Sequence, residues 1–577
     1  MAIFTFDASH TLGCVRSVDT RRVDIQVNTD EDLRKARVGQ LVAISLPGAI
    51  EEWLIGMIGK VVKTPILEEA TDSDTIETED TGELTRERVL NTVRLTLIGA
   101  VKLDNDNNPC FTRSLVQVPE IDAECHILRD AQLQSFMNLL SIEGQGEHSL
   151  MLGKYTIDES ANAYLDGNKL FQRHASLLGS TGSGKSWTVA AILEQAAKLP
   201  SSNLVVFDLH GEYSELSYAR HLHIPGPEEL GTTSDTLLFL PYWLLNAEEM
   251  QAMFIDRSEF SAHNQVMAFQ DAVVSEKRAT LESLGKTEVL NAFTLDSPIP
   301  FDIKNVISEL TRLNIEMVPG AKGGERQGPF YGNFSRLLIR LDSKINDKRY
   351  GFLFQAPESE NNYDSMANMA KRLMDYSESG GQIKVIDFSE VPADILPIIV
   401  GLAARIIYQV QFWTDRNKRK PMAFVCDEAH IYLPRKEGKN PVEQRAIENF
   451  EKIAKEGRKY GVALLVISQR PSDVSTTILS QCNNVIALRL TNSDDQLTVK
   501  KLMPESLEEL MDTLPILDIG EALVVGDAVL LPSRIRINPP TEKPLSITID
   551  FWTEWSKQPA TPDFEKAVEN MRKQNRE

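Results

Sequence analysis

The stretch Gly179-Ser180-Thr181-Gly182-Ser183-Gly184-Lys185-Ser186 decides the fold, because it is a complete P-loop motif. It follows an apolar run, Ala175 to Leu178, that predicts a strand, and it precedes a run, Trp187 to Lys198, that predicts a helix. A glycine-rich turn leaves backbone N–H groups free to surround phosphate oxygens, and the helix start adds its positive dipole end. We expect Lys185 to reach the β- and γ-phosphates of ATP and the Ser186 hydroxyl to ligate Mg²⁺. The eight loop residues and the adjoining Trp187 form the candidate nucleotide site.

Length and composition bound the class of protein. At 577 residues the chain is too long for one core, so two or three domains are expected. The formal charge of -22 argues against a protein whose whole surface is positive. It does not exclude a narrow basic channel, because a nucleic-acid-binding surface depends on the local arrangement of charges. The five cysteines lack C-x-x-C spacing, which favours buried thiols over zinc or disulfides. With neither a leader peptide nor an 18-residue apolar run, we expect a soluble, cytoplasmic protein with no membrane partner.

The N-terminal part predicts a small β-barrel, because short strands follow one another without a helical run. A segment rich in Asp, Glu and Thr, about residues 68–87, reads as a solvated, disordered hairpin loop between two of these strands, with a functional acidic arm as the alternative. We expect the barrel to occupy residues 1–130. The expected strands are Leu12 to Val18, Arg22 to Val27, Gln40 to Leu46, Trp53 to Val62, Val89 to Ile98 and Ser114 to Val118.

An α/β pattern follows, and it predicts a P-loop core over residues 131–545. Further strands are expected at Asn203 to Phe207, Ile383 to Phe388, Ala423 to Asp427, Val462 to Ser468 and Val485 to Leu490. Helical periodicity dominates between them, which predicts a helical subdomain inserted at about residues 243–374. Residues 546–577 are expected to form a C-terminal arm with a helix whose Phe564, Val568 and Met571 share one face.

Paired carboxylates end one of the expected strands. Asp427 is predicted to hold Mg²⁺ through its hydration shell, and Glu428 to polarise the attacking water. The strand that ends at Phe207 leads into Asp208-Leu209-His210-Gly211-Glu212-Tyr213, and parallel sheets bind ligands at this edge. Glu212 is therefore a second candidate base, and the choice between the two glutamates stays open.

Two more polar residues flank the strand Val462 to Ser468. Gln469 follows it and is placed to sense the γ-phosphate or to position water, with a simple polar cap as the alternative. Arg458 precedes it, at the sheet end away from its own P-loop, where it cannot easily reach its own nucleotide. We predict that Arg458 reaches a neighbouring subunit's γ-phosphate. The alternative is a cation that complements a helix dipole.

These features together resemble the HerA family, in the FtsK/HerA branch of P-loop ATPases. The resemblance rests on the P-loop, the segment 208–213, Cys-Asp-Glu-Ala-His at 426–430, Glu-Gly-Arg-Lys-Tyr-Gly at 456–461 and Ser-Gln-Arg-Pro-Ser at 468–472. It implies a RecA-like core with the helical insertion, a HAS-type barrel, and a homohexameric ring that translocates double-stranded DNA with a partner nuclease or other effector. The positions that match family motifs are Lys185, Ser186, Asp427, Glu428, Arg458 and Gln469, with Asp208, as a further metal ligand, and Glu212 in the second-strand motif.

Two functions remain open at this point. A DNA motor, acting in DNA end processing or phage defence, needs basic pore loops, and Arg435, Lys436 and Lys439 are the candidates, with a solvated turn as the alternative. An ATP-regulated platform would instead activate a nuclease or sirtuin-type NAD hydrolase without processive translocation. In either case we expect the effector to dock on the barrel and the C-terminal arm to brace the ring.

Overall fold

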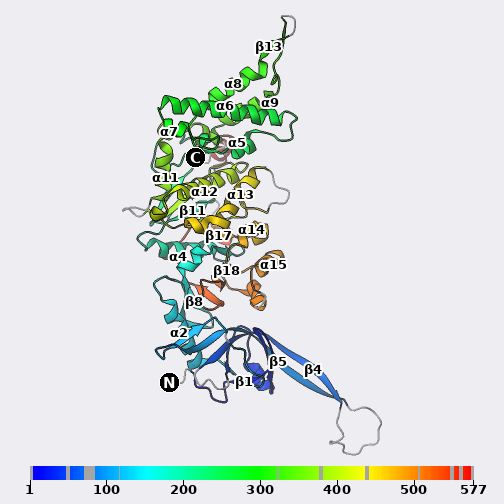
Figure 1. Cartoon of the computed structure of the whole chain (residues 1–577). Coiled ribbons are helices and arrows are strands. Elements are labelled where there is room, and N and C mark those ends of the chain that lie inside the picture. Colours follow the sequence, from blue (N-terminus) through cyan, green and yellow to red (C-terminus); the bar gives the residue numbers. More distant parts are fainter. Residues whose placement is uncertain are drawn as a thin grey trace, which may run out of the picture. The chain divides into compact units, whose positions relative to one another are not determined.

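The structure is a computed structural model that describes residues 4–46, 52–69, 85–115, 117–320, 324–375, 381–435, 441–504, 507–545, 551–557 and 563–573. It is mixed α/β with an N-terminal β-barrel, which confirms the predicted fold class (Figure 1). The chain divides into two compact units. The first comprises Met1–Thr188, Arg470–Ser472 and Asn483–Pro539, and the second comprises Val189–Gln469, Asp473–Cys482 and Pro540–Glu577.

Six strands of the first unit close a barrel in the order β2-β1-β7-β3-β4-β5, with β5 pairing back to β2, and β6 adds to β5. Buried aliphatic side chains such as Val15, Ile44 and Leu95 fill it. The expected strand Ser114 to Val118 is wrong, because the described residues of this segment form no strand and the sixth barrel strand is the short β7 between β1 and β3. The elements are β1 (Thr11–Asp19), β2 (Arg22–Val27), α1 (Asp30–Lys35), β3 (Leu41–Ser45), β4 (Trp53–Glu69), β5 (Thr85–Leu103), β6 (Pro109–Thr112) and β7 (Glu124–Ile127).

Strands β4 and β5 are much longer than predicted. They stay paired out to Glu69 and Thr85 and run out of the barrel as one long hairpin (Figure 1). The acidic segment, which was predicted to be a loop over residues 68–87, therefore begins within β4 and ends within β5. Residues 70–84 lie outside the described residues.

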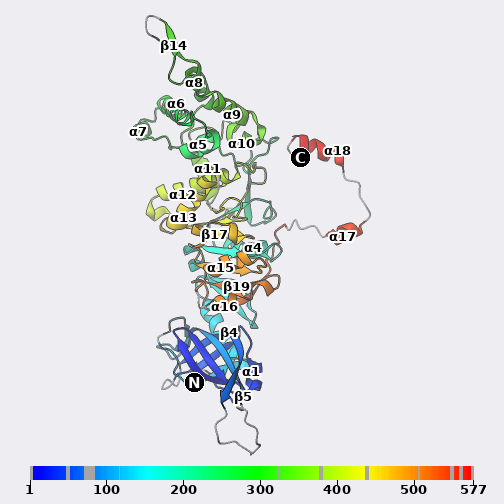
Figure 2. The same ribbon diagram turned by 90° about the vertical axis from the view of Figure 1, so that its right-hand side faces the viewer.

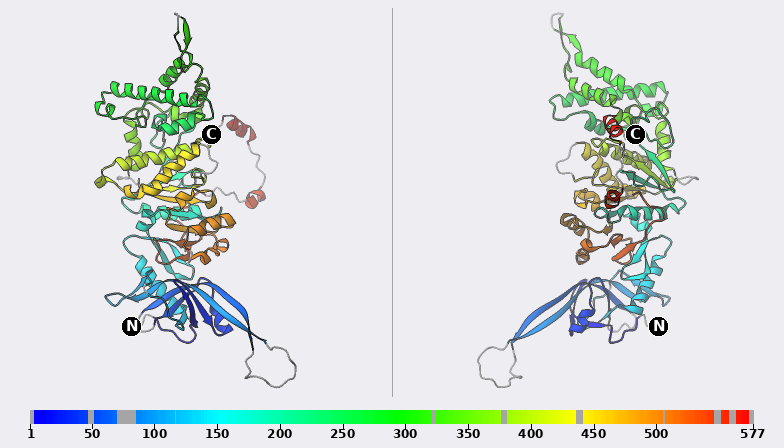
Figure 3. Two further views of the ribbon diagram at one scale, coloured as in Figure 1. Left: turned by 45° about the vertical axis from the view of Figure 1, so that its right-hand side comes forward. Right: turned by 180° about the vertical axis from the view of Figure 1, so that it is seen from behind.

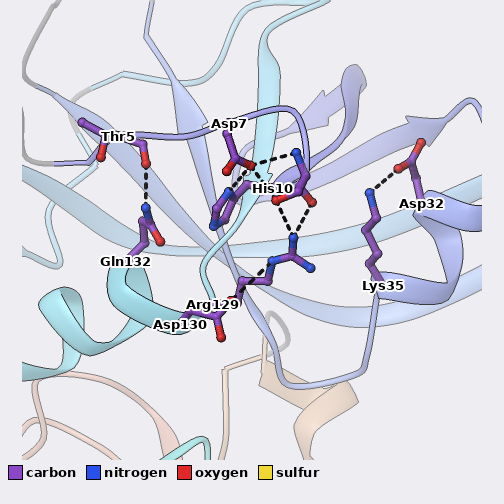
Figure 4. Close-up of polar contacts among 9 residues, drawn as sticks. Thr5, Asp7, His10, Asp32, Lys35, Arg129, Asp130 and Gln132 are labelled. Atoms are coloured by element: carbon purple, nitrogen blue, oxygen red, sulfur yellow. Dashed lines mark hydrogen bonds and ion pairs between the residues drawn. The ribbon is translucent and has the colours of Figure 1, made fainter.

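The N-terminal segment forms hydrogen bonds with residues at the start of α2 (Asp130–Gly144). The backbone carbonyl of Thr5 accepts a hydrogen bond from Gln132 Nε2 at 2.6 Å. Arg129 Nη2 donates to the carbonyl and the hydroxyl oxygen of Ser9, at 2.8 and 2.7 Å (Figure 4). Because Arg129 and Gln132 stand at the start of α2, this helix and the barrel's first segment hold each other in place.

The rest of the first unit carries the P-loop. Its strands take the order β10-β18-β19-β20-β8-β9, in which β10 and β18 are parallel and the other pairs antiparallel. The elements are β8 (Ser149–Tyr155), β9 (Asp158–Asp166), α3 (Gly167–Gln172), β10 (Ala175–Leu178), α4 (Lys185–Ala197), which runs on into the second unit, β18 (Asn484–Leu488), α15 (Ser493–Lys501), α16 (Glu508–Met511), β19 (Glu521–Val525) and β20 (Ser533–Ile537).

The second unit contains a parallel run of strands in the order β12-β15-β11-β16-β17. Two helices, α12 and α13, lie side by side (Figure 3). Parallel strands bring their carboxyl ends to one edge, where ligands bind in such sheets. The elements are β11 (Leu204–Asp208), β12 (Ala219–His223), β15 (Ile383–Asp387), α12 (Leu396–Trp413), β16 (Met422–Cys426), α13 (Pro441–Glu456), β17 (Val462–Ser468) and α14 (Thr476–Leu479).

Helix α12 is long and apolar enough to cross a membrane by length and composition alone. However, 78% of its apolar window is buried inside the protein. Its charged Arg405 is buried too, and it makes two hydrogen bonds to Glu249, at 2.8 and 2.7 Å. These contacts are those of a core helix.

The helical subdomain expected between residues 243 and 374 is present as a group of helices (Figure 2). A hairpin of β13 and β14 projects from it (Figure 2). Two further helices, α17 (Phe551–Ser556) and α18 (Phe564–Lys573), follow near the C-terminus. The inserted elements are α5 (Ala247–Phe254), α6 (Ala262–Ser283), α7 (Thr287–Leu290), α8 (Ile303–Ile315), β13 (Met317–Pro319), β14 (Glu325–Gln327), α9 (Ser335–Asn346), α10 (Gly351–Phe354) and α11 (Ser365–Met374).

Candidate nucleotide site

The P-loop joins β10 to α4 in a conformation that needs its glycines. Gly182 has φ 73° and Gly184 has φ 105°, values in the left-handed region that glycine tolerates and L side chains do not. Helix α4 begins at Lys185, so its first N–H groups face the loop. Lys185 Nζ donates to the backbone carbonyl of Ser180 at 3.3 Å, which folds the lysine across the loop. The geometry is that of an anion cradle with a lysine at its centre.

Neighbouring strands of the same unit hold the loop from behind. The Ser180 N–H donates to the carbonyl of Arg489, just after β18, at 2.8 Å. The Gly520 N–H, just before β19, donates to the carbonyl of Ser183 at 3.1 Å. A Cβ at Gly179 would stand 2.6 Å from the Ser183 hydroxyl, so the loop's first turn has no room for a side chain. The loop is thus braced before any ligand binds.

The remaining expected loop residues lie at the mouth of the loop or beside it. Thr181 and Trp187 are exposed, and Ser186 is half-buried at the start of α4. A serine hydroxyl in this position is a suitable ligand for the magnesium ion of a nucleotide. Trp187 lies one position further along the helix, with 37% of its surface exposed.

In the second unit, Asp427 and Glu428 follow β16. Asp427 is buried, and its Oδ1 accepts a hydrogen bond from the Glu428 N–H at 2.9 Å. Glu428 itself has φ 44°, a left-handed backbone that is rare for a residue with a side chain and common at functional turns. Its Oε2 lies 3.2 Å from Nδ1 of His430. The strand end is therefore a tight turn that presents two adjacent carboxylates.

The negative charges at this turn favour the binding of a cation. Burial raises the pKa of Asp427 well above its usual value, and the nearby carboxylates of Glu428, Glu212 and Asp208 raise it further. A divalent cation with a phosphate ligand would relieve this repulsion. Among the residues that the structure describes, no cluster of three or more His, Cys, Asp or Glu is set to hold a metal directly. The side chains thus fit a magnesium ion that takes its other ligands from the nucleotide and water.

Asp208, expected beside the metal, is placed differently. Its Oδ1 accepts hydrogen bonds from the N–H groups of His210 and Glu212, at 3.1 and 3.2 Å, and its Oδ2 accepts one from Tyr213, at 2.9 Å. Both oxygens thus organise the turn after β11. This geometry favours a role in shaping the turn over direct metal binding.

The turn that Asp208 shapes carries Glu212 and Tyr213. Glu212 is half-buried and close enough to contribute to the raised pKa of Asp427. Tyr213 is fully buried, and burial together with the Asp427 charge raises the pKa of its hydroxyl well above 10.0. The hydroxyl therefore stays protonated beside the carboxylates. The sequence contained Tyr213 in the motif but gave it no role, because only the fold shows that its ring is buried at this site.

Gln469 and Arg458 stand at opposite ends of β17. The Ala429 N–H donates to the carbonyl of Ile467 at 2.9 Å, so Gln469 follows the strand at the edge of the Asp427 turn. Arg458 is exposed in the 3-10 turn Gly457–Tyr460, before the strand begins. Seven strand residues span about 20 Å, several times the reach of an arginine side chain. Arg458 thus lies far from the carboxylates of its own subunit.

The candidate DNA loop is described only at its start. Arg435 is exposed, and its N–H donates to the carbonyl of Asp473 at 2.9 Å. Pro434 and Val474 form an isolated antiparallel bridge beside it. Lys436 and Lys439 lie outside the described residues. The base of the loop is therefore anchored next to the segment that follows Gln469.

Known proteins share long stretches of similar sequence with this chain. The chain matches the family "Helicase HerA, central domain" over residues 150–407 and the family "Helicase HerA-like C-terminal" over residues 398–565. It is 24% identical over 480 residues to the DNA double-strand break repair helicase HerA of Saccharolobus solfataricus, which covers 80% of this chain and 84% of that protein. It is 27% identical over 421 residues to the HerA helicase of Pyrococcus furiosus, covering 68% and 70%.

Solved structures to which the chain shows some similarity include VirB4 of Thermoanaerobacter pseudethanolicus, with a TM-score of 0.43 and 16% identity over 68% of this chain and 97% of that one. The conjugative coupling protein TrwB, solved with ADP and Mg²⁺, gives a TM-score of 0.44 and 12% identity over 71% and 93%. The two family matches together run from the strands before the P-loop to the C-terminal helices. The chain therefore belongs to the HerA family of helicase-type P-loop ATPases.

Proposed function

We propose that this protein is a Mg²⁺-dependent ATPase that forms a homohexameric ring and translocates double-stranded DNA for a partner nuclease or other effector. The observation that carries the proposal is the buried carboxylate group at the ends of β11 and β16, in a chain that also has a braced P-loop. The crowding of these carboxylates raises the pKa of Asp427. A cation bound to a phosphate chain nearby would offset their mutual repulsion.

Each side chain has a distinct part in the proposed reaction. Lys185 and the loop N–H groups hold the phosphates, and Ser186 and the hydrated Asp427 hold magnesium. The bound metal supplies positive charge that offsets the charge of the phosphates. Glu428 orients the attacking water and accepts its proton, because it stands at the turn next to Asp427 and beside His430. Glu212 remains the second candidate for that proton, and Gln469 positions the water or senses the γ-phosphate.

The position of Arg458 supports the proposed ring. An exposed arginine about 20 Å from the carboxylates of its own subunit can act only on a nucleotide bound elsewhere. A head-to-tail contact that repeats with rotation closes into a ring, and each subunit then supplies its arginine to the next. Six subunits are the number that the family resemblance implies.

DNA and effector are assigned to different parts of the chain. We place duplex DNA at the loop that begins with Arg435 and continues through Lys436 and Lys439, inside the ring. The effector docks on the barrel, whose long hairpin of β4 and β5 extends its surface. The C-terminal arm braces the ring through α18, on which Phe564, Val568 and Met571 are exposed. We place the protein in the cytoplasm, in DNA end processing or phage defence.

The test is ATP hydrolysis by the full chain, measured with and without linear duplex DNA. The proposal predicts stimulation by DNA that declines with salt, by about one unit of logarithmic slope for each phosphate contact. Arg435→Ala with Lys436→Ala should lower both the stimulation and the slope, whereas the exposed pair Lys304→Ala with Lys348→Ala serves as the control. Hydrolysis that DNA does not change, together with tight effector binding, would favour an ATP-regulated platform.

A further inference from the structure

His430 stands in the turn after β16, two positions beyond the proposed base Glu428. Its ring atom Nδ1 lies 3.2 Å from Oε2 of Glu428. Both side chains are largely withdrawn from water, with 15% of the His430 side chain and 12% of the Glu428 side chain exposed. A polar contact at such a place is screened little by solvent, so it holds its partners more firmly than a surface contact does. The contact therefore bears directly on the carboxylate of the proposed base.

The same ring nitrogen also reaches the neighbouring strand of the sheet. Nδ1 of His430 lies 3.4 Å from the hydroxyl oxygen of Ser468, the last residue of β17, which is fully buried. Strand β17 pairs with β16, and Gln469, the candidate sensor of the γ-phosphate, follows Ser468 directly. His430 is thus placed between the proposed base at one strand end and the proposed sensor at the next.

The turn that carries His430 is closed by its main chain. The Ile431 N–H donates to the carbonyl of Glu428 at 2.9 Å, and the Leu433 N–H donates to the carbonyl of Ala429 at 2.7 Å. The Ala429 N–H in turn donates to the carbonyl of Ile467, which attaches the turn to β17. Because these main-chain bonds set the shape of the turn, the imidazole is not needed for it. Its contact with the Glu428 side chain calls for another explanation.

The chemistry of imidazole offers one. A neutral ring has one N–H donor and one bare nitrogen that accepts. With the proton on Nδ1, the ring of His430 donates to the Glu428 carboxylate; with the proton on Nε2, Nδ1 accepts from the Ser468 hydroxyl. A charged acceptor makes the stronger hydrogen bond, so the carboxylate at 3.2 Å favours the first arrangement. In it, Oε2 of Glu428 is held by the ring.

We infer that His430 is the residue that positions the proposed base. Its Nδ1–H holds Oε2 of Glu428 in one orientation, and its contact with Ser468 ties that orientation to the end of β17. The inference rests on the proposed function, because only there does Glu428 act on water. His430 acts through Glu428 alone and touches neither nucleotide nor water. A base that is held in place from behind loses less of its rate to misaligned conformations.

The test is steady-state ATP hydrolysis by the full chain with Mg²⁺, analysed for kcat and KM separately. His430→Leu removes both ring nitrogens and should lower kcat about 10- to 100-fold, with KM for ATP changed less than about twofold. His430→Asn should recover most of the loss, because its amide nitrogen lies close to the place of Nδ1. His430→Gln should not, because its amide reaches the place of Nε2 instead.

A histidine outside the site supplies the matched control. His223 ends β12 in the same unit, and its Nε2 lies 2.9 Å from a carboxylate oxygen of Glu229. His223→Leu should hydrolyse ATP like the wild type. Affinity for a fluorescent ATP analogue and the melting temperature should stay at their wild-type values in the His430 variants. If His430→Leu melts early, the comparison of His430→Asn with His430→Gln decides alone.

A double variant shows whether His430 acts through Glu428. In a Glu428→Gln background, His430→Leu should cost no further rate, because the carboxylate that the ring holds is already absent. A full additional loss would overturn the inference, and so would a wild-type kcat for His430→Leu or equal rates for the Asn and Gln variants. A Glu428→Gln protein as active as the wild type would also overturn it, while leaving an ATPase with another base. A wild-type chain that does not hydrolyse ATP would overturn the proposed function and this inference with it.

Discussion

We expect the chemistry of this site to depend on Asp427, since it is buried, lies near three other carboxylates and has the Tyr213 hydroxyl beside it. A carboxylate in such surroundings favours its protonated form until a cation arrives. We therefore expect the site to bind its metal and its nucleotide together. The neighbouring Glu428 stands in a strained backbone conformation.

Replacing Glu428 with Gln should lower the rate of ATP hydrolysis by about 10²- to 10⁴-fold, the usual contribution of a general base. ATP binding, measured by titration with a fluorescent analogue, should be retained. Glu212→Gln is the matched control and should cost less than about tenfold, because Glu428 directly follows Asp427 at the end of β16 whereas Glu212 lies on the turn after β11. If the two variants exchange these results, Glu212 is the base.

The raised pKa of Asp427 also predicts how stability depends on pH. The folded protein holds a proton that the unfolded chain, with a pKa of 3.8, has already released. The free energy of unfolding should therefore fall as pH rises from about 4 toward the folded-state pKa, and Asp427→Asn should remove this part of the slope. The measurement is the melting temperature of nucleotide-free protein from about pH 5 to about pH 8, where unfolding curves are routinely recorded. Parallel curves for wild type and variant would show that Asp427 is not perturbed.

At the scale of the elements, sequence patterns predicted the strands that frame the site, because β10, β11, β16 and β17 are apolar runs bounded by polar turns. The pattern failed for α12, which is buried on nearly every side and so has no polar face to reveal a helical period. It also failed for β12, an edge strand with a polar sequence, and for the short barrel strand β7. The three backbone N–H groups that donate hydrogen bonds to Asp208 could not be predicted. The sequence places Asp208 at the end of a strand but does not show how the following turn folds back.

Helix α12 offers an element-level prediction. Arg405 and Glu249 join α12 to α5 as a buried ion pair, and Asn449 of α13 also donates to Glu249 at 3.2 Å. Glu249→Ala leaves a buried guanidinium without its carboxylate and should destabilise the protein by about 3–5 kcal/mol. Glu249→Leu combined with Arg405→Met should recover most of that loss. Thermal unfolding of the single and double variants measures the coupling, and a single variant as stable as wild type would contradict the packing described.

At the scale of the whole molecule, the proposed ring requires Arg458 to act on a neighbour. Mixing increasing fractions of Arg458→Ala subunits into wild-type protein should lower ATPase activity more steeply than dilution alone, because each variant subunit silences a site that is not its own. Sites with an arginine supplied in trans lose about 10³-fold or more in rate without it. Activity that falls in strict proportion to the wild-type fraction would argue that each subunit hydrolyses ATP independently.

The central claim is that ATP hydrolysis at this site moves the protein along duplex DNA. Displacement of a labelled third strand from a triplex at the end of a linear duplex tests it most directly, since translocation removes that strand without any need to unwind the duplex. The wild-type protein with Mg²⁺ and ATP should release the third strand, whereas Lys185→Ala, Glu428→Gln and wild type with a non-hydrolysable analogue should not. Vigorous ATP hydrolysis by the wild type on the same DNA, with the third strand left in place, would contradict the account.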